Sequence, residues 1–273
     1  MSAITRFMPK NHLSYLVGKL VHIKLPTFLN KLIITCFAKA YDINLAEAEL
    51  PVEKYPSLGD FFVRRLKYGI RPIAATWAVH PADSLITQAG KITSGKLIQA
   101  KNKTYSLESF TQDKKSLEKY NNGSFLTYYL CPTDYHRVHS PVNGEIKRVV
   151  YIPGALWPVN AWSTENIHEL FSINERVLIE IETDRGPVGI VFVGATNVGQ
   201  IVLTFDPEIV GNQLLSSAVI VKNYSNLKIN KGDELGMFRM GSTVVMLYSE
   251  KTITSVGLDM WINEQVLVNS EFS

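Results

Sequence analysis

The sequence has little cysteine and little charge, which excludes several common protein classes. Its two cysteines, Cys36 and Cys131, lie far apart and outside any C-x-x-C motif. This argues against a disulfide framework and favours a reducing compartment. Charged residues make up 19% of the 273 residues, yet the 46% apolar content is enough for a core in one large or two small domains. Disordered and collagen-like classes are excluded.

Several sequence motifs of common classes are also missing. There is no G-x-G-x-x-G motif, no P-loop and no alternating βαβ pattern, so nucleotide chemistry of the common kinds has no support. No serine lies in a G-x-S-x-G elbow, which argues against the usual hydrolase architecture. No apolar run approaches the roughly 18 residues that a membrane-spanning helix needs.

Acidic residues are absent from residues 1–40, which contain six lysines and arginines and therefore carry a charge of +6. The whole chain has 28 basic and 25 acidic residues, so the remainder carries 22 basic residues against 25 acidic ones, or −3. A nucleic-acid-binding protein spreads positive charge over its body. We therefore expect no nucleic-acid partner.

Two stretches of this basic segment, residues 12–21 and 28–37, have apolar side chains at helical spacing, and Pro26 separates them. Amphipathic helices with cationic flanks suit an anionic bilayer surface, where each Lys or Arg contributes about 1 kcal/mol. An ordinary core-facing helix pair has the same pattern, and targeting peptides are also basic and poor in acid. The pattern alone leaves these alternatives open.

The rest of the chain predicts one more helix and then many strands. Residues 57–66 are expected to form a helix, because Ser57 and Asp60 resemble a capping box. Beyond about Arg71, short β-branched and aromatic runs alternate with turn signals. The sequence therefore predicts an α+β protein, with a helical membrane-docking region over residues 1–70 and a mainly antiparallel β sandwich or barrel-like body over residues 71–273. The clearest strand candidates are residues 124–130, 176–183, 188–193, 218–222 and 243–248.

Residue types that can perform chemistry occur in three short segments. Asp83 lies in a proline-bounded turn, His136 and His139 lie three residues apart, and Ser242 follows Gly241. Each also has a purely structural interpretation. Asp83 is a common turn former, the two histidines fit a half-buried strand, and Gly-Ser is a common dipeptide. The two histidines also suit part of a metal site, although no third ligand has an obvious spacing. Together, an Asp, a His and a Ser are the components of an activated serine.

Longer stretches resemble the phosphatidylserine decarboxylase family. The main ones are residues 232–243, GDELGMFRMGST, and residues 134–141, DYHRVHSP. Shorter similarities are FFVR at residues 61–64, PAD at 81–83, YIPG at 151–154, NER at 174–176 and VGAT at 193–196. The resemblance covers nearly the whole chain. Two positions depart from the family pattern: Met240 replaces the common Leu, and Ser84 replaces the Gly that commonly follows the Asp.

The resemblance implies that the chain makes its own cofactor by cleaving itself between Gly241 and Ser242. Ser242 would attack the Gly241 carbonyl, His139 would take the hydroxyl proton, and Asp83 would hold the imidazole in the useful tautomer. The products would be residues 1–241 and an associated chain of 32 residues that begins with a pyruvoyl group derived from Ser242. The resemblance implies no metal.

The pyruvoyl group would form a Schiff base with phosphatidylserine, and phosphatidylethanolamine and CO2 would result, with His136 as the proton donor. A lipid substrate implies that residues 1–40 dock on a membrane. Since no secretory signal is recognised, we expect a peripheral protein on the cytoplasmic face of a bacterial inner membrane. Two other hypotheses are an unprocessed membrane-associated lipid-binding β-domain and a metal hydrolase that uses His136, His139 and an acid. A homo-oligomer is left open.

Overall fold

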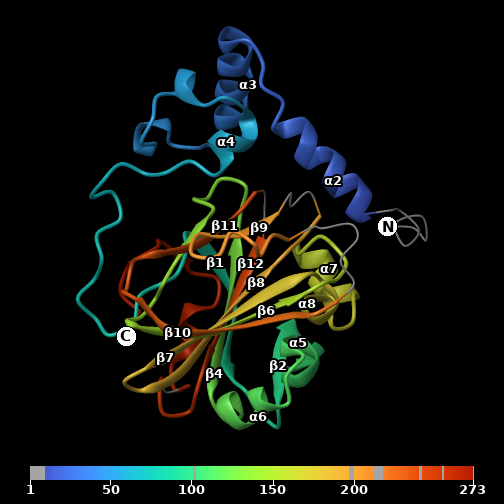
Figure 1. Ribbon diagram of the computed structural model, residues 1–273, viewed down its shortest axis with the longest axis vertical. Helices are drawn as coiled ribbons and strands as arrows, with labels where there is room; N and C mark the ends of the chain where they lie inside the picture. The colour runs from blue at the N-terminus through green and yellow to red at the C-terminus, as the bar shows by residue number, and fades with distance from the viewer. Residues whose placement is uncertain are drawn as a thin grey trace.

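The computed structural model describes residues 10–100, 103–196, 200–211, 218–239, 242–253 and 255–272. Figure 1 shows a β-rich body with a separate group of N-terminal helices above it, and the segment that follows α4 connects the two. The predicted α+β class, with N-terminal helices before a mainly antiparallel body, is confirmed.

The N-terminal group begins with α2 (Lys10–Val21) and α3 (Thr27–Ala40), which Pro26 separates as expected. Two short 3-10 helices follow, η1 (Leu45–Glu47) and η2 (Val52–Lys54). The group has a small apolar core of its own, formed by Ile34, Ala38, Ile43, Tyr55 and Phe61. None of the helices in the described residues is long and apolar enough to cross a bilayer.

The next helix, α4 (Leu58–Phe62), is shorter than expected. Its predicted cap is present, since the Ser57 hydroxyl accepts a hydrogen bond from the Asp60 amide at 3.1 Å and donates one to the Asp60 carboxylate at 2.6 Å. The helix ends early because the Val63 carbonyl accepts a hydrogen bond from Arg137 Nε at 2.9 Å. This tertiary contact ties the end of α4 to the body.

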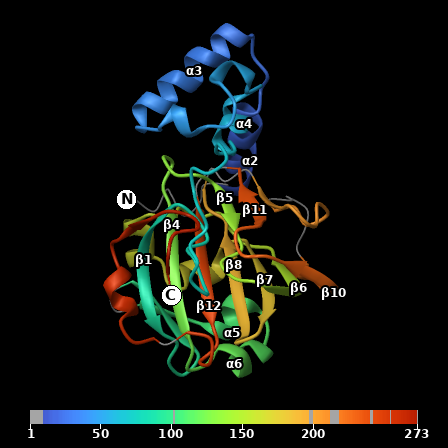
Figure 2. The same cartoon turned by 90° about the vertical axis from the view of Figure 1, so that its left-hand side faces the viewer.

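The body contains an eight-stranded antiparallel sheet in the order β10-β6-β7-β8-β12-β4-β1-β13. Figure 2 shows most of these strands side by side. Because β10 and β13 are edges, the sheet is open and does not close into a barrel. In chain order its strands are β1 (Ser84–Lys91), β4 (Ser124–Leu130), β6 (Gly144–Ile152), β7 (Arg176–Thr183), β8 (Gly186–Val193), β10 (Ile220–Ile229), β12 (Ser242–Tyr248) and β13 (Gln265–Val266).

Smaller elements complete the body. A three-stranded sheet contains β5 (Arg137–His139), β11 (Glu234–Phe238) and β9 (Ile201–Leu203), and a hairpin contains β2 (Lys96–Ala100) and β3 (Lys103–Ser106). Four short helices gather on one side of the large sheet (Figure 1). They are α5 (Leu107–Thr111), α6 (Lys115–Tyr120), α7 (Ala161–Asn166) and α8 (Leu170–Ile173), and η3 (Leu258–Trp261) lies near the C-terminus.

The central strands follow the predicted runs closely. The predicted strands at residues 124–130 and 176–183 coincide with β4 and β7, and every residue of β12 is buried. The strand expected at residues 218–222 was too short, because β10 continues to Ile229. A register shift between Asn223 and Leu227 interrupts its alternation, so the sequence pattern ends before the strand does.

Candidate active site

The register of the sheet brings two of the predicted site residues to one end. Leu85 of β1 lies opposite Tyr129 of β4, while Ser242 of β12 lies opposite Leu130 on the other side of β4. Asp83 precedes β1 directly, so it lies at the same sheet end as Ser242. The two strands that carry them flank β4 and are therefore about 10 Å apart.

The histidine segment is attached to the same end. The His139 amide donates a hydrogen bond to the Pro81 carbonyl at 2.8 Å, and His139 lies opposite Glu234 of β11. The fold thus gathers Asp83, His139 and Ser242 from distant parts of the chain. Gly241, the other residue of the predicted cleavage site, lies outside the described residues.

Ser242 is fully buried at the first position of β12. Within the described residues its hydroxyl has no hydrogen-bond partner. A buried polar atom left without a partner costs about 1–3 kcal/mol. Such atoms are uncommon in folded proteins and often have a catalytic role. The lone pairs of the Ser242 hydroxyl are therefore not engaged by the described parts of the fold.

The half-buried imidazole of His139 has a partner on each nitrogen. Its Nδ1 lies 2.7 Å from the Gly232 carbonyl oxygen, and its Nε2 lies 3.1 Å from the Tyr135 hydroxyl. Because a carbonyl only accepts, Nδ1 carries the hydrogen, and Nε2 of the neutral ring accepts from Tyr135. Burial lowers the pKa of His139 below its usual value, although the bond to Gly232 opposes this shift. His139 is therefore a neutral base at pH 7.

The buried Asp83 carboxylate is held by Arg71 and by a backbone amide. Arg71 Nε lies 3.1 and 3.2 Å from the two carboxylate oxygens, and Arg71 Nη2 lies 2.7 Å from Oδ2. The Val268 amide donates to Oδ1 at 2.8 Å. The contacts described for Asp83 do not include the predicted hydrogen bond with the His139 imidazole. In this geometry the Gly232 carbonyl sets the tautomer of His139, and Asp83 acts on the ring through its charge.

The turn around Asp83 accommodates Ser84, one of the two departures from the family pattern. Ser84 is buried as the first residue of β1, and its hydroxyl donates to the Ala82 carbonyl at 3.2 Å. This local hydrogen bond spans the Asp83 backbone. Ser84 therefore adds a bond to the turn that presents the carboxylate.

His136 is fully buried directly before β5, after the turn that follows β4. Its Nδ1 lies 2.9 Å from the Asp134 carbonyl, so Nδ1 carries the hydrogen of the neutral ring. Its Nε2 is buried without a partner among the described residues. Burial lowers the pKa of His136 to about 3, with the Asp134 bond opposing the shift. The ring is therefore neutral at pH 7, with a free lone pair on Nε2.

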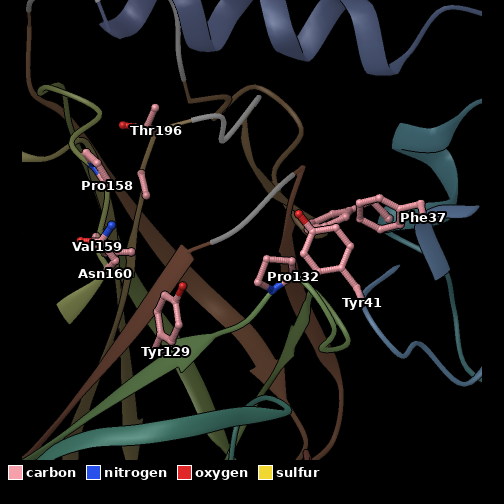
Figure 3. A pocket seen from close by; sticks show the side chains of 10 residues that line it. Phe37, Tyr41, Tyr129, Pro132, Pro158, Val159, Asn160 and Thr196 are labelled. Carbon is pink, nitrogen blue, oxygen red and sulfur yellow. The ribbon is translucent and has the colours of Figure 1, made fainter. Parts of the chain in front are cut away.

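An apolar pocket of about 220 Å³ opens at this end of the sheet. Tyr129 and Pro132 of the body line it, as do Phe37 and Tyr41 from the α3 end and Phe62 of α4. Figure 3 shows Phe37 and Tyr41 on one side, with Pro132 and Tyr129 facing them. The remaining lining residues are Pro158, Val159, Asn160, Ala195 and Thr196. The pocket is therefore built jointly by the helical group and the body.

Several residues of this site had no individual signal in the sequence. Arg71, Tyr135 and Gly232 were not predicted to act, although Tyr135 and Gly232 lie inside the segments that carry the family resemblance. No local pattern indicates that Arg71 pairs with Asp83. Within the described residues no group of three or more His, Cys, Asp or Glu side chains is arranged to hold a metal ion.

Comparison with known proteins identifies the family. Residues 58–271 match the family model for phosphatidylserine decarboxylase. The chain belongs to the phosphatidylserine decarboxylase family. The resemblance noted in the sequence is thereby confirmed, and membership makes this protein a decarboxylase, a lyase of phospholipid metabolism.

Relatives within this family match over most of their length. The chain is 36% identical to the phosphatidylserine decarboxylase proenzyme of Myxococcus xanthus, over 92% of this chain and 90% of the relative. It is 40% identical to the proenzyme of Saccharophagus degradans, over 92% of this chain and 89% of the relative. It is also 40% identical to the proenzyme of Vibrio cholerae, over 90% and 89%. These matches therefore cover most of the chain, and the family model covers it from the first residue of α4 onward.

Proposed function

We propose that this chain is a proenzyme that cleaves itself between Gly241 and Ser242 and then converts phosphatidylserine to phosphatidylethanolamine and CO2. The observation that carries the proposal is the buried hydroxyl of Ser242, which has no partner among the described residues and lies at the sheet end that also holds His139 and Asp83. The word proenzyme in the names of the relatives supports processing.

Self-cleavage begins when the Tyr135 hydroxyl releases Nε2 of His139, Ser242 Oγ attacks the Gly241 carbonyl carbon, and the hydroxyl proton of Ser242 passes to that nitrogen. Glycine has no Cβ to obstruct this approach. The peptide C–N bond then breaks, and the amine of residue 242 takes the proton from His139, which leaves an ester between Gly241 and the Ser242 oxygen. Loss of the α-proton of residue 242 expels the Gly241 carboxylate. Addition of water and loss of ammonia then leave a pyruvoyl group at the new N-terminus.

The surroundings of Ser242 fit a group formed at this position. Strand β12 pairs with β4 and β8 along its length, so the chain that begins at residue 242 stays in the sheet after cleavage. Ser242 is fully buried, which keeps bulk water away from the first step, in which the ester forms. When formed, the pyruvoyl group supplies the electron sink that decarboxylation of an amino acid headgroup requires. The two product chains remain associated through the β-ladder.

His136 transfers a proton to and from the substrate. The ammonium group of phosphatidylserine must lose a proton before its nitrogen can act as a nucleophile. The neutral His136 ring has a free lone pair on Nε2, so it accepts this proton and returns it to the product carbon after CO2 leaves. The low pKa makes protonated His136 a strong acid toward the product carbon, and because decarboxylation consumes one proton, the amine of the product takes a further proton from solvent.

The N-terminal helices bring the enzyme to its lipid substrate. Leu16, Leu20, Phe28 and Leu32 are large apolar side chains that α2 and α3 leave exposed. They lie in the segment that carries a charge of +6, which attracts an anionic bilayer. Because the pocket begins at α3, a lipid held at these helices lies beside it. We propose docking on the cytoplasmic face of a bacterial inner membrane.

Intact-mass spectrometry of the purified, folded protein tests the proposal. We expect two chains, residues 1–241 and a 32-residue chain whose mass corresponds to an N-terminal pyruvoyl group in place of serine. The same sample should release CO2 from phosphatidylserine in vesicles. A single intact chain of 273 residues would contradict the proposal and favour an unprocessed, lipid-binding β-domain.

A further inference from the structure

Arg71 connects the Asp83 carboxylate to the N-terminal helical group. Its Nη2 lies 2.7 Å from Asp83 Oδ2 and 3.0 Å from Glu47 Oε2, and Glu47 is the last residue of η1. The Asp83 and Arg71 side chains are only 5% and 13% exposed, whereas Glu47 is 30% exposed. This chain of charges extends from the surface of the helical group to the end of the sheet.

The hydrogen bonds of Asp83 are nearly saturated by these contacts. A carboxylate has about four lone-pair positions. Those of Asp83 accept three contacts from Arg71 and one from the Val268 amide. Across the described chain Arg71 is the cation paired with Asp83. Arg71 therefore fixes both the direction of the carboxylate and the location of its buried negative charge.

The location of this charge matters because His139 must become an imidazolium when it takes the Ser242 proton. The His139 ring bonds to Gly232 and Tyr135 rather than to Asp83, so Asp83 stabilises the imidazolium by its electric field. Such an interaction depends on the distance between the two charges and is strong where water is excluded. Any movement of the Asp83 carboxylate therefore changes the barrier to self-cleavage.

We propose that Arg71 is a positioning residue for self-cleavage, acting through Asp83 and anchored on its outer side by Glu47. The proposal rests on the proposed self-cleavage. Arg71 contacts neither Ser242 nor the imidazoles in the described structure, and its role ends once the pyruvoyl group has formed. It therefore affects how fast the proenzyme matures much more than the turnover of the mature enzyme.

The experiment separates maturation from turnover. Arg71→Gln should slow self-cleavage by about ten- to a hundredfold, because small misplacements of a catalytic charge cost this much. Turnover of phosphatidylserine per cleaved chain should fall by a much smaller factor than the cleavage rate. Arg71→Lys keeps the charge but loses the forked contact. Its cleavage rate should therefore lie between that of Arg71→Gln and that of the unsubstituted protein. Glu47→Gln should slow cleavage less than Arg71→Gln.

Two controls make the inference falsifiable. Arg148→Gln breaks a comparable, partly buried pair with Asp113 and should leave the cleavage rate unchanged. In an Asp83→Asn background, adding Arg71→Gln should have little further effect, because Arg71 acts through Asp83.

Three results would overturn the role of Arg71. The first is a normal cleavage rate in Arg71→Gln. The second is a loss of turnover per cleaved chain in Arg71→Gln that is as large as its loss of cleavage. The third is a double variant in which Arg71→Gln slows cleavage as much as it does when Asp83 is present. If Arg71→Gln does not fold, Arg71→Lys and Glu47→Gln decide by the same measurements. Failure of the unsubstituted protein to cleave would instead contradict the proposed function, so the two failures are distinguishable.

Discussion

The imidazole of His136 packs against the ring of Phe62, with 4.0 Å between the ring centroids. Phe62 ends α4 of the helical group, whereas His136 belongs to the body. The predicted division into residues 1–70 and 71–273 stays a prediction, but the site uses side chains from both sides of it. Whatever moves the helices against the body therefore changes the surroundings of His136.

Replacement of His136 should separate the two reactions. His136→Ala should still cleave, because His139 serves as the base for Ser242, but decarboxylation should fall by about 10²–10⁴-fold. The two rates are measured by intact mass and by CO2 release from phosphatidylserine. In His139→Ala, by contrast, cleavage itself should be blocked. Equal loss of cleavage in both variants would contradict these separate roles.

Ser242→Ala should prevent both cleavage and activity without weakening the fold. The Ser242 hydroxyl has no described partner, so its removal should leave the free energy of unfolding unchanged or raise it by up to about 1 kcal/mol. Denaturant unfolding and intact mass measure the two effects. Ser124→Ala is the matched control, since Ser124 is also buried and follows a glycine, but its hydroxyl donates to the Ile253 carbonyl at 3.2 Å. Ser124→Ala should cleave normally.

The rate of self-cleavage should depend on pH through His139. Burial lowers the pKa of this base below its usual 6.5. A group with a lowered pKa stays unprotonated to lower pH, so the decline of the cleavage rate with falling pH should be centred below pH 6.5. Cleavage half-times of freshly purified proenzyme across this range test the expectation. A decline centred at or above pH 6.5 would show that His139 is not held as the buried neutral base described here.

Membrane binding should depend on the exposed apolar side chains of α3. The double replacement of Phe28 and Leu32 by Asp should reduce sedimentation with anionic phosphatidylglycerol vesicles by at least about tenfold, because it removes apolar contacts and adds negative charge. High salt should weaken binding of the unsubstituted protein. Met260→Asp, an exposed apolar position in η3, is the control and should bind normally. Unchanged binding by the double variant would contradict docking through α3.

The sequence by itself determined the features that depend on neighbouring residues. The buried runs of β4 and β7, the break at Pro26 and the cap at Ser57 follow from patterns within a few residues, where backbone geometry and side-chain periodicity act directly. The basic charge of residues 1–40 is likewise a property of composition. Residue types singled out the candidate site residues, but the family resemblance supplied their roles, since separated Asp, His and Ser residues have no local signal that assigns one.

Only the tertiary structure decided which partner each of these residues has. The Gly232 carbonyl, not Asp83, holds His139 Nδ1, and Arg71 occupies the Asp83 carboxylate. These contacts join segments that meet only after β1, β4 and β12 align at one end of the sheet. Strand order and register depend on the packing of the whole chain, so no short window of the sequence contains them.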